Sequence, residues 1–200
     1  MKYRINQRTQ DRISEIGLGS VYMPQTPLKE AIPALRQAYE GGINYYDLAA
    51  GDGKAFPMYG EAFADVRKSI LYQIHFGADY SKGTYGWSLN LDTVKRSIEK
   101  QLKELRTDYI DYGFIHCQDE FSDWETYQKN GVYDYILKLK EQGIVRHIGL
   151  SSHTPAVIQR ILDEAAVDML MFSVNPAYDY GQGEYHRRSR YYPACHQYGL

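Results

Sequence analysis

The stretch LDTVKRSIEKQLKELRTDYIDYGFIH, residues 91–116, contains a complete helix followed by a strand. Segment 110–116 is short and mostly apolar, as expected of a parallel strand that is covered on both faces, and it ends on His116. The preceding part carries apolar side chains every three or four residues, which indicates an amphipathic helix capped by Asp92: Val94, Ile98, Leu102 and Leu105.

The same alternation of strands and helices continues along the whole chain. Strands are expected at 16–22, 44–48, 70–76, 110–116, 146–151 and 169–175. Helices are expected at 26–41, 59–68, 92–105, 132–142, 154–165 and 184–197. Because each parallel crossover needs a covering helix, this order predicts one α/β domain over residues 1–200, with an N-terminal β-hairpin at 2–13. A TIM barrel of the (β/α)8 type needs about 250 residues, so we expect a barrel truncated to about six β/α units.

The composition excludes several classes of protein. With 23 basic and 25 acidic side chains the formal net charge is −2, which offers no attraction for nucleic acid or an anionic membrane. No apolar run approaches the length of about 18 residues that a membrane span needs. The two cysteines, Cys117 and Cys195, lie far apart in the sequence, which argues against a disulfide framework or a cysteine metal site and predicts a cytoplasmic location.

Polar or titratable residues stand at the ends of five successive predicted strands. In a parallel barrel these ends meet at one rim, where the loops build the active site. A single such residue is usually a helix cap or a hydrogen-bonded buried group, but five in succession favour a functional site. They are Asp47, His75, His116, Ser151 with Ser152 and His153, and Asn175.

Three motifs stand in the same order as in a known family: GINYYD at 42–47, DYGFIH at 111–116 and KEQGIVRHIGLSS at 140–152. In these motifs the chain resembles the aldo-keto reductases over nearly its whole length. The resemblance implies a (β/α)8 barrel and NADPH-dependent reduction of an aldehyde or ketone, with a small-molecule carbonyl compound as substrate. It also implies a catalytic Asp, Tyr, Lys and His, in which the lysine lowers the pKa of the tyrosine that donates a proton.

Two of these four catalytic positions are altered here. Asp47 matches the family's aspartate and His116 matches its histidine. Asp52, followed by the expected Gly53, stands where the family has its tyrosine, and His75 stands where it has its lysine.

The resemblance also marks positions for the nicotinamide cofactor: Ser151, Ser152 in place of the usual Asn, Met171 in place of the usual Gln, and Asn175 at the following strand end. The family binds the adenosine phosphates with loops after the seventh and eighth strands, which would lie beyond residue 200. We therefore expect weak NADPH binding, and self-association through the open edges of the first and sixth strands. Trp87 and Trp124 are expected walls of the substrate pocket.

The altered positions leave three mechanisms open. In a reductase, one side chain donates the proton: His116 oriented by His75 and Asp47, or a substitute phenol of Tyr46, Tyr59 or Tyr80. In a hydrolase, a divalent metal activates water and is held by His75, His116, His153 and Asp47. In the third case the barrel binds a cofactor or partner without turnover.

Overall fold

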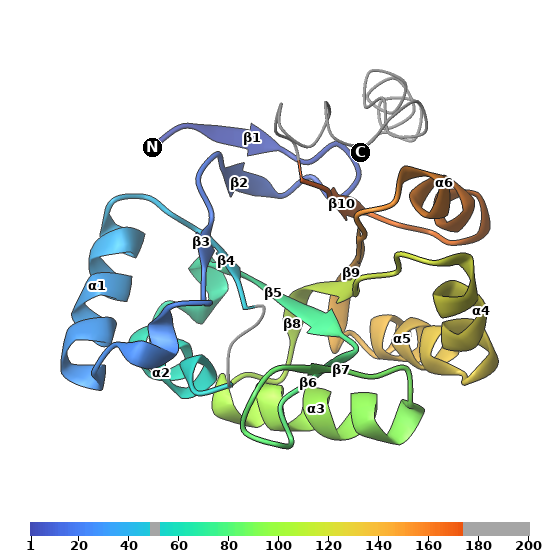
Figure 1. Ribbon diagram of the computed structural model, residues 1–200. Helices are drawn as coiled ribbons and strands as arrows, with labels where there is room; N and C mark the ends of the chain where they lie inside the picture. Colours follow the sequence, from blue (N-terminus) through green and yellow to red (C-terminus); the bar gives the residue numbers. More distant parts are fainter. Residues whose placement is uncertain (49–52, 174–200) are drawn as a thin grey trace.

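The computed structural model describes residues 1–48 and 53–173. Its central sheet has six parallel strands in the order β10-β9-β8-β5-β4-β3 and curls as part of a barrel (Figure 1). The strands are β3 (Leu18–Gly19), β4 (Tyr45–Asp47), β5 (Leu71–Phe76), β8 (Ile110–Ile115), β9 (Val145–Ser151) and β10 (Met169–Met171). The predicted α/β fold with a partial barrel is confirmed.

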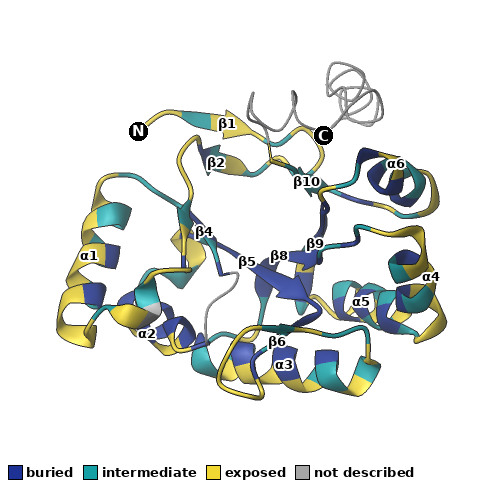
Figure 2. Ribbon diagram, in the orientation of Figure 1, coloured by how far each residue is buried: buried dark blue, intermediate teal, exposed yellow. Residues whose placement is uncertain are grey.

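Helices cover the outer side of this sheet (Figure 1). Figure 2 shows the central strands β5, β8 and β9 mostly buried, whereas most helices combine buried with exposed residues, as amphipathic helices do. No helix within residues 1–48 and 53–173 is long and apolar enough to cross a membrane. The helices are α1 (Leu28–Glu40), α2 (Ala55–Ala62), α3 (Leu91–Glu104), α4 (Phe121–Lys129), α5 (Val132–Glu141) and α6 (Pro155–Glu164), with short 3-10 turns at Met23–Gln25 and Arg67–Ser69.

The predicted N-terminal hairpin pairs β1 (Tyr3–Ile5) with β2 (Arg12–Ser14) in an antiparallel manner. Its turn contacts the amino-terminal end of the sheet, where the Tyr112 hydroxyl donates to Asp11 at 2.6 Å. In the described sheet β3 and β10 are the edge strands. Self-association through these edges and a cytoplasmic location both stay predictions.

The helix boundaries differ from the expected ones at two places. The helix expected at 59–68 begins four residues earlier, at Ala55, because Pro57 fits a first helical turn, and it ends at Ala62. The cap of α3 is Asn90 rather than Asp92, since the Asn90 side chain accepts the Thr93 N–H at 3.0 Å. The helix expected at 184–197 lies outside the described residues.

Two elements were not predicted from the sequence. A hairpin of two-residue strands, β6 (Ala78–Asp79) and β7 (Gly86–Trp87), follows β5 directly. Helix α4 lies between β8 and α5, and its buried residues, Trp124 and Tyr127, are too few to give a strong apolar pattern. Trp124 is completely buried, so the structure contradicts its expected place in a pocket wall.

Gly60 lets α2 approach the end of α3 closely. A Cβ at this position would lie 2.3 Å from the carbonyl oxygen of Glu104, which is backbone and cannot rotate away. We expect Gly60→Ala to lower the free energy of unfolding by about 1–3 kcal/mol, despite the better helix propensity of alanine. Urea unfolding measures this change. Gly19→Ala is the control, because nothing lies within 4 Å of that added Cβ, and equal losses in both variants would contradict the explanation.

Candidate functional site

Side chains at three neighbouring strand ends form a continuous chain of contacts. Asp47 ends β4, and its Oδ1 lies 2.7 Å from Nε2 of His75 in β5. Nδ1 of His75 lies 2.8 Å from Nδ1 of His116, which directly follows β8. The predicted convergence of these strand ends is therefore confirmed, while the catalytic roles of the three residues stay predictions.

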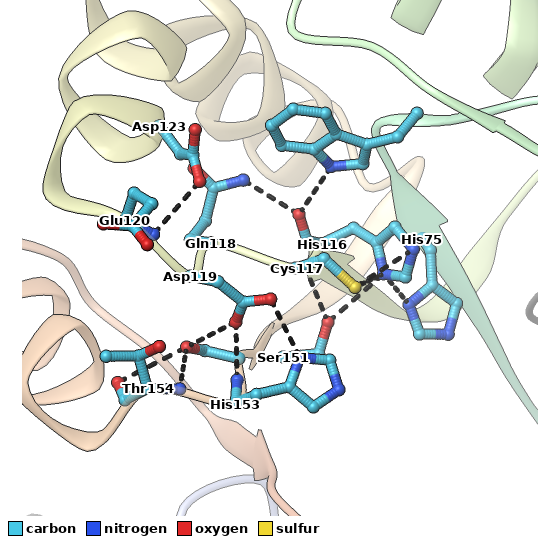
Figure 3. Close-up of polar contacts among 12 residues, drawn as sticks. His75, His116, Cys117, Gln118, Asp119, Glu120, Asp123, Ser151, His153 and Thr154 are labelled. Atoms are coloured by element: carbon cyan, nitrogen blue, oxygen red, sulfur yellow. Dashed lines mark hydrogen bonds and ion pairs between the residues drawn. The ribbon is translucent and has the colours of Figure 1, made fainter.

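His116 is fixed from several sides, as Figure 3 shows. Ser151 ends β9, and its Oγ lies 3.2 Å from Nδ1 of His116 and accepts the backbone N–H of Cys117 at 3.1 Å. The carbonyl oxygen of His116 accepts hydrogen bonds from Gln118 Nε2 at 2.8 Å and Trp87 Nε1 at 3.2 Å. These contacts hold both the ring and the backbone of His116 at the rim.

Burial keeps the His116 imidazole neutral. It lowers the pKa of His116 from its usual value to about 3, and the neighbouring His75 and His153 act in the same direction. An imidazolium is thus scarce at neutral pH. This environment argues against the expectation that a charged His116 is the proton donor.

Tyr85 is a site residue that the sequence analysis missed. It lies in the turn between β6 and β7, and its hydroxyl is 2.7 Å from Nε2 of His116. The sequence contains 20 tyrosines, and no motif or spacing distinguishes this one from the rest.

The three tyrosines considered as substitute phenols make other contacts. The hydroxyl of Tyr46 donates to the carbonyl oxygen of Ile43 at 2.9 Å, and that of Tyr59 to Gly19 at 3.4 Å. The Tyr80 hydroxyl is buried without a hydrogen-bond partner in the described part of the chain. None of these contacts is with His116.

The expected cofactor positions are only partly described. Ser151 and Ser152 are nearly buried at the end of β9, and Met171 ends β10. Gln118 lies near them, because its backbone N–H donates to the Ser151 carbonyl oxygen at 3.2 Å. The side-chain oxygen of Gln118 is buried without a partner among the described residues. Hydroxyls together with a free amide acceptor fit the carboxamide of a nicotinamide, which both donates and accepts hydrogen bonds. Asn175 and Asp52, the latter expected at the position of the family's tyrosine, lie outside the described residues.

The expected metal site is not formed by the described residues. His153 turns toward another loop, where its Nδ1 lies 2.9 Å from Asp119 Oδ2 and its backbone N–H donates to Asp119 Oδ1. His75 and His116 contact each other directly. Residues 1–48 and 53–173 contain no group of three or more His, Cys, Asp or Glu side chains placed to hold a metal ion. The described residues therefore do not bring together the four side chains that the hydrolase alternative expects.

The neutral His116 predicts a loss of stability in acid. Because its pKa is lower in the folded than in the unfolded chain, the unfolded chain binds more protons below about pH 6.5, and stability falls as the pH falls toward 3. We expect this residue to contribute a slope of about 1.4 kcal/mol per pH unit through that range. Urea unfolding at several pH values should show a shallower slope for His116→Asn. Equal slopes for both proteins would contradict the assignment.

Comparison with known proteins identifies the family. A model of the aldo/keto reductase family matches residues 15–199. The chain is 29% identical over 166 residues to an uncharacterised oxidoreductase of Bacillus subtilis, which covers 80% of this chain and 51% of that protein. It is 26% identical over 177 residues to L-galactose dehydrogenase of Arabidopsis thaliana, covering 80% and 52%. The chain thus spans about half the length of these curated relatives.

Solved structures share the fold. An aldo-keto reductase from Bacillus halodurans in its holo form superimposes with a TM-score of 0.81 at 23% identity, covering 100% of this chain and 64% of that one. An aldo/keto reductase from Klebsiella pneumoniae in complex with NADP and acetate gives a TM-score of 0.70 at 22% identity, covering 100% and 66%. Since the family model matches nearly the whole sequence, the chain belongs to the aldo/keto reductase family.

Proposed function

We propose that the protein reduces an aldehyde or ketone with NADPH at the rim formed by the ends of β4, β5, β8 and β9. The observation that carries this proposal is the continuous contact of Asp47, His75 and His116 at that rim. Membership of the family supports it, as do relatives that are named oxidoreductase or dehydrogenase. The Klebsiella pneumoniae neighbour in complex with NADP supports the choice of cofactor.

The rim offers groups for both the cofactor and the substrate. When bound, NADPH supplies the hydride that the carbonyl carbon accepts. Ser151 and the buried side-chain oxygen of Gln118, which has no partner among the described residues, would hold the nicotinamide carboxamide. The partly exposed rings of Tyr85 and Trp87 would contact the substrate, which favours an apolar carbonyl compound.

The test measures the absorbance of NADPH while the full chain is incubated with the cofactor and each of a series of simple aldehydes. Substrate-dependent oxidation is the expected result. If the absorbance of NADPH does not fall, even in a single turnover at high protein concentration, the proposed reaction is contradicted. That result together with measurable NADPH binding would instead favour the alternative of a binding protein without turnover.

Asp47 orients the pair of histidines in this reaction. Its carboxylate accepts a hydrogen bond from His75, so its removal leaves the imidazoles without a fixed tautomer. We expect Asp47→Asn to lower kcat by about a hundredfold with little change in KM. Asp65→Asn is the control, because Asp65 pairs with Arg36 on the exposed surface. A loss confined to KM, or the same loss in both variants, would contradict an orienting role.

A further inference from the structure

Tyr85 contacts the central imidazole of the site from a loop that the family motifs do not include. Its hydroxyl lies 2.7 Å from Nε2 of His116, and 39% of the residue is exposed at the rim. We propose that Tyr85 donates the proton to the carbonyl oxygen, in place of the tyrosine that the family has at the position of Asp52. This inference rests on the proposed function, because it assigns a residue to that reaction.

The hairpin that carries Tyr85 is held in place by the site itself. Trp87, two residues further on, donates from Nε1 to the carbonyl oxygen of His116. The next residue, Ser88, donates its backbone N–H to Gly77 at 2.8 Å, which closes the hairpin against the end of β5. The rings of Tyr85 and His116 meet edge to face, with centroids 6.0 Å apart. The phenol is therefore positioned by contacts on both sides rather than by its own loop alone.

With both imidazoles neutral, the hydrogen bonds of the site run in one direction. A carboxylate can only accept, so Nε2 of His75 donates to Asp47, and Nδ1 of His75 is left as an acceptor. His116 then donates from Nδ1 to His75, and its bare Nε2 accepts the O–H of Tyr85. The Gln73 amide nitrogen also lies near Nε2 of His75, at 3.0 Å, but the closer, charged carboxylate decides where the proton sits.

The acidity of Tyr85 suits a donor to an alkoxide. Burial, with a smaller contribution from Cys117, raises the pKa of Tyr85 to about 12. An alkoxide is about as strong a base as hydroxide, whose conjugate acid has a pKa of about 15.7, so transfer from the phenol is downhill. The phenol also stays protonated at neutral pH, where the neutral His116 has no proton to give from Nε2.

The step balances with one hydride and one proton. The carbonyl carbon accepts the hydride and forms a C–H bond, and the π electrons of the C=O bond move to the oxygen. For this the single O–H of Tyr85 turns from Nε2 of His116 to that oxygen, which takes the proton and gives an alcohol and a phenolate. The phenolate recovers a proton from water, which reaches Tyr85 because this residue is partly exposed. His116 is a positioning residue in this step, since it holds the phenol until the carbonyl oxygen takes over the hydrogen bond and does not itself change charge.

The first test compares Tyr85→Phe with Tyr135→Phe in the full chain. Tyr135 is a half-buried tyrosine of α5 that lies away from the rim, with the ammonium of Lys95 over its ring at 5.3 Å. We expect Tyr85→Phe to lower kcat/KM for carbonyl reduction by about a hundredfold or more, and Tyr135→Phe to leave it unchanged. The wild-type kcat/KM should be constant between about pH 6 and 9, since the donor does not titrate there. A tenfold fall per pH unit would overturn the role of Tyr85 in favour of an imidazolium donor.

The second test needs neither cofactor nor turnover. In nitrogen NMR spectra of the ligand-free protein, we expect the His116 Nε2 signal to shift in Tyr85→Phe and to stay in place in Tyr135→Phe. An unchanged signal would overturn the hydrogen bond on which the proposal stands. Full reductase activity in Tyr85→Phe would overturn the role of Tyr85 alone. A wild-type chain without any reductase activity would overturn the proposed function, and the donor role with it.

Discussion

The geometry of the rim depends on the ion pairs and hydrogen bond of one buried carboxylate, that of Asp111. It is fully buried at the opposite end of the sheet, where it contacts Arg67 at 2.8 Å and Arg146 at 3.0 Å and accepts the backbone N–H of Tyr72 at 2.9 Å. Removing a partner from a buried charge costs about 3–5 kcal/mol, so β5, β8 and β9 cannot slip past one another cheaply. The strand register that is fixed at this end places His75 next to His116, which follows β8.

Strand periodicity explains why much of the rim could be predicted from the sequence. Side chains two residues apart lie on the same face of a strand. Tyr45 of β4 packs inside the sheet with Tyr112 and Phe114 of β8, and Asp47 and His116 continue these two rows by one step each. The convergence of the strand ends follows from a local backbone pattern, which a single sequence contains.

Residues outside these rows depend on long-range contacts and could not be predicted in the same way. Tyr85 reaches the site on strands of two residues, which are too short to leave an alternating pattern. His153 follows β9 closely, so the sequence predicts it at the rim, but its side chain contacts Asp119 on another loop instead. Cys117 turns the chain after β8 with a φ of 48°. This left-handed conformation is uncommon for residues other than glycine, so the residue type does not predict it.

The resemblance to the family predicts a lysine at the position of His75, and a histidine there would change how a phenol at this rim exchanges protons. An ammonium group beside a phenol favours the phenolate and lowers its pKa toward neutrality. Here His75 instead contacts a neutral His116, and burial raises the pKa of Tyr85 to about 12. With Tyr85 as the donor, reduction uses the phenol, which is present throughout the neutral range, whereas alcohol oxidation needs the scarce phenolate. Because the overall equilibrium includes one proton, this proposed donor would place the whole pH dependence on the rate of oxidation and leave the rate of reduction independent of pH.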